Sequence, residues 1–214
     1  MNAIIGRKLG MTRIFDEKGQ AIPVTVVEAG PCPIVQLRTF EDGGGSVQLG
    51  FGERKAKRTS KAMAGHAKAG TLDAAPAVVR EFPMRADEQA NLQVGETVTV
   101  ESFASGDAVK VTGTTKGRGF QGVVKRYGFS GGPATHGSTR YRRPGSMGPG
   151  TDPSRVIKGK KLPGQYGATQ HTEMGLRVVK VDPERNLLFI KGAVPGSRTG
   201  VIVVRKQAGS GRYA

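Results

Sequence analysis

One long basic segment, Lys116 to Gln165, constrains the fold of this chain more than any other part of its sequence. Up to Lys161 it holds eleven Lys and Arg residues against a single acid, Asp152, a net charge of +10. The whole segment also contains 12 Gly and 5 Pro, and its scattered apolar residues follow neither a helical nor a strand period. Such a segment buries too little apolar surface to offset the entropy lost on ordering. We therefore expect a long basic loop that takes shape on a partner.

The sequence on either side of this segment favours short strands rich in β-branched residues. The expected strands are Ile22–Glu28, Pro33–Arg38, Ser46–Phe51, Glu96–Glu101, Ala108–Thr112, Leu176–Val181, Leu187–Lys191 and Val201–Arg205, with Glu96–Glu101 and Ala108–Thr112 forming a hairpin. Many short strands with turns every ~8–12 residues favour a barrel or a sandwich. Since strands occur near both ends, we expect the N- and C-terminal parts to share one sheet, with the basic loop inserted between strands.

A second basic stretch precedes the long one. Six bases lie within fifteen residues that contain no acid: Arg54, Lys55, Lys57, Arg58, Lys61 and Lys68. Alanines give this stretch and the following Ala74–Ala90 some helix propensity, so short helical pieces are expected there. The stretch is either a solvated charged face or an RNA contact, and its one-sided charge favours RNA.

The overall charge narrows the class of partner. The chain carries 33 Lys and Arg against 17 Asp and Glu, a net charge of +16. This balance points to a polyanion, namely RNA, DNA or an anionic membrane surface, although a merely basic enzyme is also possible. No apolar run reaches the ~18 residues of a membrane span, and no secretory signal is expected at the start. The lone Cys32, between two prolines, excludes an internal disulfide and a cysteine zinc site; we expect a small buried residue and a reducing, cytoplasmic setting.

Motifs that could carry chemistry are weak. Gly117–Gly122 matches G-x-G-x-x-G, but the residues up to Phe129 are too few for the helix of a nucleotide-binding βαβ unit, and arginines stand where such a site needs an acid. The three histidines lack metal-ligand spacing, and the serines of the segment lack a nucleophile elbow. We therefore expect no catalysis, no metal and no cofactor. The glycines are interpreted instead as backbone that lies close to a polyanion.

Aromatic residues interleaved with bases indicate RNA. Phe120, Tyr127, Phe129, Tyr141 and Tyr166 alternate with Lys and Arg, and unstacked bases stack on such rings while cations neutralise phosphates. Phe120 and Phe129 could instead anchor the loop to the barrel. The densest patch is Arg140–Gly145. The predicted RNA-binding residues are Lys116, Arg118, Lys125, Arg126, His136, Arg140, Tyr141, Arg142, Arg143, Arg155, Lys158, Lys160 and Lys161, with Arg54, Lys55, Lys57, Arg58 and Lys61 of the second stretch.

Several stretches resemble one protein family closely. They are Ala3–Thr12 (AIIGRKLGMT), Pro23–Gln36, Thr112–Arg126, Gly131–Pro133 with His136–Gly137, Arg143–Gly148, Lys158–Lys161 and Asn186–Gly196. The likeness spans nearly the whole chain, which is similar to the bacterial form of the universal large-subunit ribosomal protein number three. Some members of that family carry a methylated glutamine at the loop tip; this chain has none between Gly148 and Pro153.

The resemblance implies a mainly β fold and a role in the ribosome. The fold would be a closed six-stranded barrel like that of translation factors, formed by residues 1–115 and 166–214, with a partly helical basic insertion at about 53–92 and a long extension at 116–165. The protein would bind 23S rRNA near its 3′ end early in assembly, beside other large-subunit proteins, in the cytoplasm. No membrane or small-molecule substrate is implied. The extension's tip would approach the peptidyl transferase centre, where RNA is the catalyst; it comprises Gly145, Ser146, Met147, Gly148, Pro149, Gly150, Thr151 and Asp152.

Two other functions remain open. A free-standing RNA chaperone or regulator would bind RNA through the same loop, and an enzyme would use the glycine motif for a nucleotide.

Overall fold

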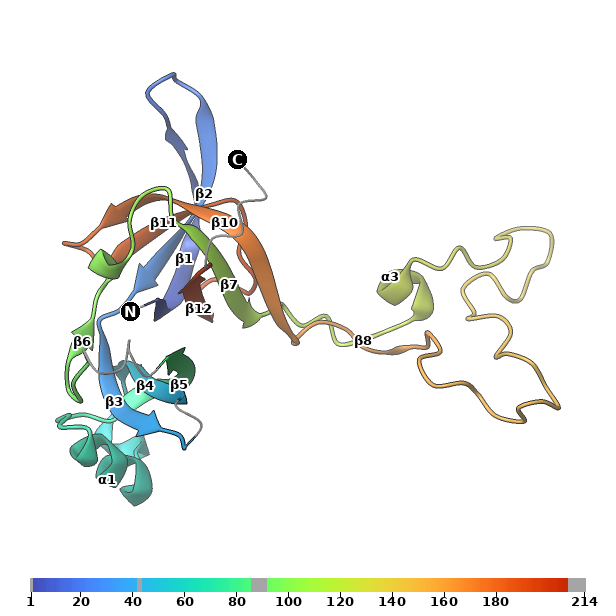
Figure 1. The fold of residues 1–214 in the computed structure, drawn as a ribbon. Coiled ribbons are helices and arrows are strands. Elements are labelled where there is room, and N and C mark those ends of the chain that lie inside the picture. The colour runs from blue at the N-terminus through green and yellow to red at the C-terminus, as the bar shows by residue number, and fades with distance from the viewer. Residues whose placement is uncertain (1, 42–43, 86–91, 208–214) are drawn as a thin grey trace. The chain divides into compact units, whose positions relative to one another are not determined.

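The computed structural model describes residues 2–41, 44–85 and 92–207, with the side chain of Arg85 excepted. The chain divides into two compact units. The first combines the residues up to Thr114 with those from Gln170 onward, and the second, which we call the arm, is Thr115–Thr169. Figure 1 shows the elements of both units.

Six antiparallel strands of the first unit close into a barrel. In their order around it, the strands are β1 (Ala3–Phe15), β12 (Val201–Lys206), β7 (Ala108–Thr114), β10 (Gln170–Asp182), β11 (Leu187–Lys191) and β2 (Ala21–Ala29), which pairs with β1 again. The pairing of β1 with β12 confirms that the two ends of the chain share one sheet.

Alternation of side chains along the strands builds the barrel core. In β7, Val109 and Val111 are buried and the residue between them is not, and Ile202 and Val204 of β12 follow the same pattern. Such a two-residue period places apolar side chains on the inner face. In β11 it is Leu188, not Leu187, that points into the core.

Gly6 shows how closely β1 and β2 approach each other. A Cβ atom at this position would lie 2.6 Å from the carbonyl oxygen of Glu28 and 2.9 Å from the Val27 side chain. Only glycine therefore fits here without a shift of the neighbouring strand.

The described part of the first unit also contains a smaller antiparallel sheet and short helical segments. The sheet order is β5 (Pro76–Arg85), β4 (Gly44–Glu53), β3 (Cys32–Thr39) and β6 (Thr97–Val98). Between β4 and β5 lie the 3-10 helix η1 (Ala56–Arg58) and helix α1 (Lys61–Ala69). One continuous hydrophobic core joins this sheet to the barrel and includes Val47, Leu49 and Phe82.

The expectation of helical pieces over Ala74–Ala90 is wrong for its described part. Residues 76–85 form β5, which pairs with β4 along its length. Val78, Val79 and the buried Phe82 have side chains that favour a strand, and the pairing with β4 outweighs the helix propensity of the alanines. Residues 86–90 lie outside the described residues.

The predicted hairpin of Glu96–Glu101 with Ala108–Thr112 is also wrong. β6 pairs with β3, the 3-10 helix η2 (Val100–Ser102) follows it, and β7 pairs with β10 and β12. The buried side chains of Val100 and Phe103 turn the chain into the core before β7 begins. The two segments therefore belong to different sheets.

Cys32 is a small buried residue, as predicted. Its Sγ donates to the carbonyl oxygen of Ile5 at 3.3 Å, and burial raises the pKa of the thiol to about 11. Among the described helices, none has the length and apolar character needed to cross a membrane.

The arm has few regular elements. They are β8 (Phe120–Gln121), helix α3 (Val123–Tyr127) and β9 (Gly164–Gln165), and β8 pairs with β9 in antiparallel fashion.

Candidate nucleic-acid interface

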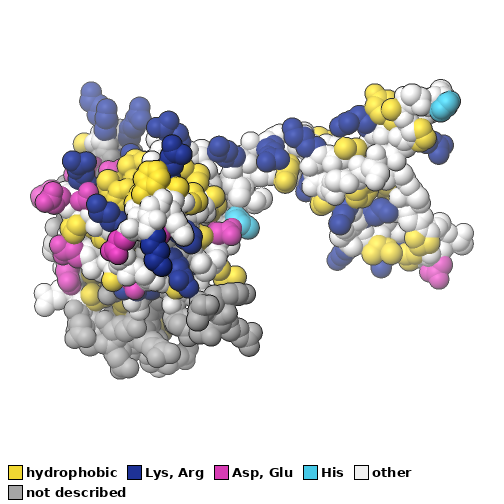
Figure 2. Space-filling view, turned by 90° about the horizontal axis from the view of Figure 1, so that it is seen from above, with side chains coloured by type: hydrophobic (Ala, Val, Ile, Leu, Met, Phe, Trp, Pro, Cys, Tyr) yellow, Lys and Arg dark blue, Asp and Glu magenta, His cyan; other side chains and the backbone are white. Residues whose placement is uncertain are grey.

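The cations of the arm are available to an external anion. The predicted RNA-binding residues of the arm are exposed except for Arg126, which is half-buried. The ion pairs of the described part of the chain, Arg38–Glu81, His171–Glu173 and Lys206–Asp107, all lie outside the arm. Acidic side chains on the visible face are gathered almost entirely on the first unit (Figure 2). The arm therefore presents positive charge that the described residues do not neutralise.

Two tyrosine rings of the arm contact three of these cations. The guanidinium of Arg126 lies 5.0 Å from the ring centroid of Tyr127, and the ammonium of Lys161 lies 5.8 Å from the same centroid. Beside β8 and β9, the guanidinium of Arg118 lies 5.0 Å from the ring centroid of Tyr166. These distances are within the range of cation–π attraction. We call these five residues the cation–aromatic cluster.

Backbone pairing places Arg118 beside Tyr166. The N–H of Arg118 donates to the carbonyl oxygen of Tyr166 at 2.8 Å, and the N–H of Tyr166 donates to that of Gly119 at 2.9 Å. At the start of the arm, the N–H of Thr115 donates to the carbonyl oxygen of Thr169 at 2.9 Å. The two chain segments of the arm base therefore run as a ladder, which continues into β8 and β9.

Helix α3 and a glycine place Arg126 and Tyr127. Val123 is buried at the start of the helix, and Gly128, with φ +73°, ends it in the left-handed conformation that glycine adopts without strain. The Arg126 Nη1 donates to the carbonyl oxygen of Leu162 at 2.7 Å. A Cβ atom at Gly164 would lie 2.6 Å from that nitrogen, so the glycine leaves room for the guanidinium.

The Arg140–Gly145 patch depends on two further glycines. The N–H of Gly132 donates to the carbonyl oxygen of Tyr141 at 3.2 Å, and Gly131 has φ +76° with no room for a Cβ atom beside that oxygen. The chain can thus fold back on Tyr141, a residue that is 52% exposed. Arg140, Arg142 and Arg143 are exposed around it.

The remaining predicted residues of the arm are exposed without joining the cation–aromatic cluster. These are Lys116, Lys125, His136, Arg155, Lys158 and Lys160, together with the eight tip residues Gly145–Asp152. Phe120 is 75% exposed, and Phe129 is half-buried with its ring centroid 6.3 Å from that of Tyr127.

The second basic stretch lies on η1 and α1. The side chain of Ser60 caps α1 by accepting from the Met63 N–H at 3.3 Å, and the Nε2 of His66 lies 3.0 Å from the Oε1 of Gln48 on β4. His66 thus fixes the helix to the sheet. Arg54, Lys55, Lys57, Arg58 and Lys61 are exposed, and the Arg54 side chain donates to the carbonyl oxygen of Ala77 at 3.2 Å.

The glycine motif does not open a nucleotide-binding unit. Within Gly117–Gly122, β8 pairs in antiparallel fashion with β9, and α3 has five residues. A dinucleotide site needs a parallel strand and a longer helix whose N-terminus faces the pyrophosphate. Among the described residues, no group of three or more His, Cys, Asp or Glu side chains could hold a metal ion.

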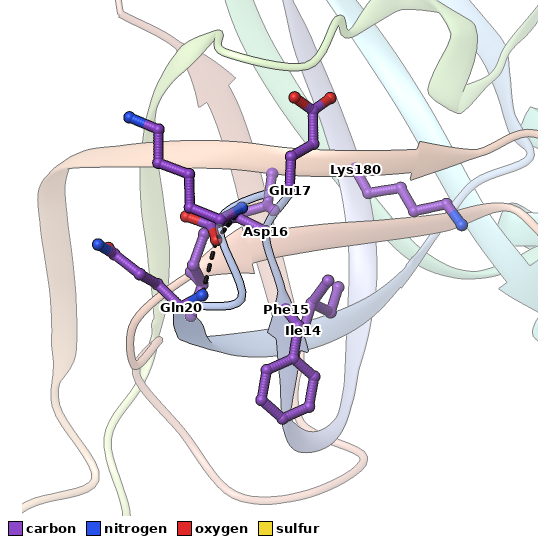
Figure 3. A pocket seen from close by; sticks show the side chains of 9 residues that line it. Ile14, Phe15, Asp16, Glu17, Gln20 and Lys180 are labelled. Carbon is purple, nitrogen blue, oxygen red and sulfur yellow. Dashed lines mark hydrogen bonds between the residues drawn. The ribbon is translucent and has the colours of Figure 1, made fainter.

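An open hollow at the end of the β1–β2 hairpin has the wrong charge for a polyanion site (Figure 3). Lys18 and Lys180 line it together with Asp16 and Glu17. One Asp16 carboxylate oxygen accepts from the backbone N–H groups of Lys18 at 3.0 Å and Gln20 at 2.7 Å, so it shapes the turn.

Tyr166 belongs to the aromatic pattern interleaved with bases but is not one of the residues predicted to bind RNA. Its contact with Arg118 depends on the register of the two arm segments. Sequence spacing alone does not reveal that register.

Comparisons with known proteins give one consistent result. Residues 85–186 match the family model for ribosomal protein L3. The chain is 50% identical over 211 residues to large ribosomal subunit protein uL3 of Herpetosiphon aurantiacus, covering 97% of each chain. It is 51% identical over 205 residues to the uL3 protein of Methylobacillus flagellatus, covering 94% of this chain and 95% of that one. It is 48% identical over 206 residues to that of Thermotoga petrophila, covering 96% and 97%.

Proposed function

We propose that this chain, which belongs to the ribosomal protein L3 family, binds 23S rRNA near its 3′ end. Members of this family are structural constituents of the large ribosomal subunit. The arm and the exposed cations between Arg54 and Lys61 are the proposed contact surfaces. In this role the protein is not an enzyme. It acts in the cytoplasm, where it binds early in subunit assembly beside other large-subunit proteins.

The cation–aromatic cluster is the observation that carries this proposal. Cations held over ring faces keep a defined position, and a guanidinium so held still has N–H groups for phosphate oxygens. The exposed residues Tyr127 and Phe120 offer ring surfaces on which unpaired bases stack. An RNA that contains both duplexes and loops provides phosphates for the cations and unpaired bases for the rings.

The tip of the arm suits a close approach to RNA. Gly145, Gly148 and Gly150 leave the backbone of this exposed stretch without bulky side chains. We propose that the tip extends toward the peptidyl transferase centre. We also propose that the six-stranded barrel is of the type found in translation factors.

Sedimentation tests the assignment directly. A tagged copy of the full chain, expressed in a bacterium, should co-sediment with large subunits in a sucrose gradient and stay bound through a high-salt wash. A matched variant with Arg140, Arg142 and Arg143 replaced by Gln should enter subunits less efficiently. Release of the wild-type chain to the top of the gradient by salt would favour a free-standing RNA chaperone instead.

A further inference from the structure

Two like charges face each other on the outside of the barrel. Arg205 of β12 is the register partner of Lys110 of β7. Val204, which precedes Arg205, and Val109 and Val111, which flank Lys110, are buried. The side chains of Arg205 and Lys110 therefore project from the opposite, outer face of the barrel. Like charges directly opposite on one face of a sheet destabilise the pairing. An anion bound between the two side chains would remove that repulsion.

Arg205 is also partly removed from water. Its guanidinium carbon lies 4.8 Å from the ring centroid of Phe82 on β5, and burial lowers the pKa of the guanidinium below its usual range. Within the described residues, the ion pairs include neither Arg205 nor Lys110. The nearby carboxylate of Asp107 already pairs with Lys206 at 2.8 Å. A partly desolvated cation without a counter-charge is unfavourable, and an anion would compensate it.

A small hollow lies where these side chains meet. Lys110, Arg205 and Lys206 line it together with Phe82, Pro83 and Met84, and its volume is about 160 Å³. Pockets for drug-sized molecules and cofactors usually measure roughly 300–1,000 Å³. This hollow therefore suits a single anionic group and not a whole nucleotide.

We propose that this hollow binds one backbone phosphate of rRNA, with Arg205 as the forked donor and Lys110 as the second cation. The Phe82 ring supports the flat face of the guanidinium and leaves its N–H edge for phosphate oxygens, the geometry for which arginine is suited. The proposal rests on the rRNA-binding function proposed above. It adds a contact on the barrel that is separate from the arm and from the Arg54–Lys61 stretch.

The salt dependence of binding tests this site. The affinity of the full chain for a transcript of the 3′ region of 23S rRNA is measured between 50 and 200 mM salt for the wild type, Arg205→Gln, Lys110→Gln and the double variant. Each lost phosphate contact reduces the steepness of the plot of log binding constant against log salt concentration by about 0.7–0.9. The wild-type affinity should therefore fall about threefold more across this range than that of Arg205→Gln. The double variant should resemble Arg205→Gln, because both cations contact one phosphate.

Two controls separate the possible outcomes. Lys18→Gln removes an equal charge from an exposed turn of the barrel unit and should leave the slope unchanged. Lys110→Gln leaves the Arg205–Phe82 contact in place and should not lower the melting temperature, so it tests the site even if Arg205→Gln is poorly folded.

A wild-type slope in both Arg205→Gln and Lys110→Gln would overturn the inference, as would a lower melting temperature of Arg205→Gln with an unchanged slope. If variants of Arg142 and Arg143 still weaken binding, the proposed function stands without this site. A slope near zero for the wild type would overturn the proposed function itself.

Discussion

Replacement of Tyr127 by Ala tests whether the cation–aromatic cluster positions charge for RNA. The change removes the ring over which Arg126 and Lys161 lie at 5.0 and 5.8 Å. Each exposed cation–π contact contributes about 0.5–1 kcal/mol. If the ring holds both cations in the geometry that RNA requires, the binding free energy should weaken by about 1–2 kcal/mol, or roughly five- to thirtyfold in affinity.

Tyr127→Phe is the matched control, because it keeps the ring and removes only the hydroxyl. Filter binding or fluorescence anisotropy with the rRNA transcript should give Tyr127→Phe an affinity within about twofold of the wild type, a small free-energy change by the same scale. The salt slope of Tyr127→Ala should stay close to that of the wild type, because no charge is removed. Equal losses for the two variants, or no loss for Tyr127→Ala, would refute the role assigned to the ring.

Three further predictions separate the fold from the RNA contacts. The double replacement of Arg142 and Arg143 by Ala should change the free energy of unfolding by no more than about 0.5 kcal/mol per site. It should nevertheless lower the rRNA affinity and reduce the slope of log affinity against log salt by about 1.5. A large fall in melting temperature would instead show that these arginines stabilise the fold. Leu188→Ala should cost about 2–5 kcal/mol, because the side chain is fully buried, and should lower the melting temperature by at least about 4 °C, whereas Leu187→Ala should cost less because Leu187 is only half-buried; equal melting losses would contradict the assigned strand face. Burial raises the pKa of Cys32 from 9.0 to about 11, so the contribution of the protonated thiol to stability is complete below pH 9 and is lost as the pH rises toward 11. Alkylation of the thiol at pH 8 should be slow in the native protein and faster in the unfolded protein. Equal alkylation rates in the two states would contradict the burial of Cys32.

Strands with a clear local signal could be predicted from the sequence. Leu187–Lys191 has the predicted bounds, and the expected strands at Ile22–Glu28 and Ser46–Phe51 lie inside β2 and β4. The two errors, β5 and the supposed hairpin before β7, arose where pairing decides the outcome. Alanine-rich sequence forms a strand when a neighbouring strand and a buried face are available, and propensity alone does not report either.

The candidate interface, like the fold, could be predicted from the sequence only where its residues are contiguous. The arm and its cations were visible as a charge imbalance, because they are contiguous in the sequence. Arg205 and Lys110 were not, since they lie far apart along the chain and meet only through the register of β12 and β7. A site built from one segment can be found by composition, whereas a site built from paired strands requires their topology.

The point at which the arm is inserted in the sequence explains how one chain can contain both a packed core and many cations without an ion-pair partner among the described residues. The arm is inserted between β7 and β10, and the residues that flank it, Thr114 and Gln170, are partners in the ladder that joins these two strands. Because the insertion leaves from and returns to paired residues, the barrel closes whatever the length of the arm, and the entropic cost of a longer loop rises only slowly. The barrel core draws none of its buried residues from the arm. The charge and shape of the arm can therefore change without disturbing the alternation of side chains that closes the barrel.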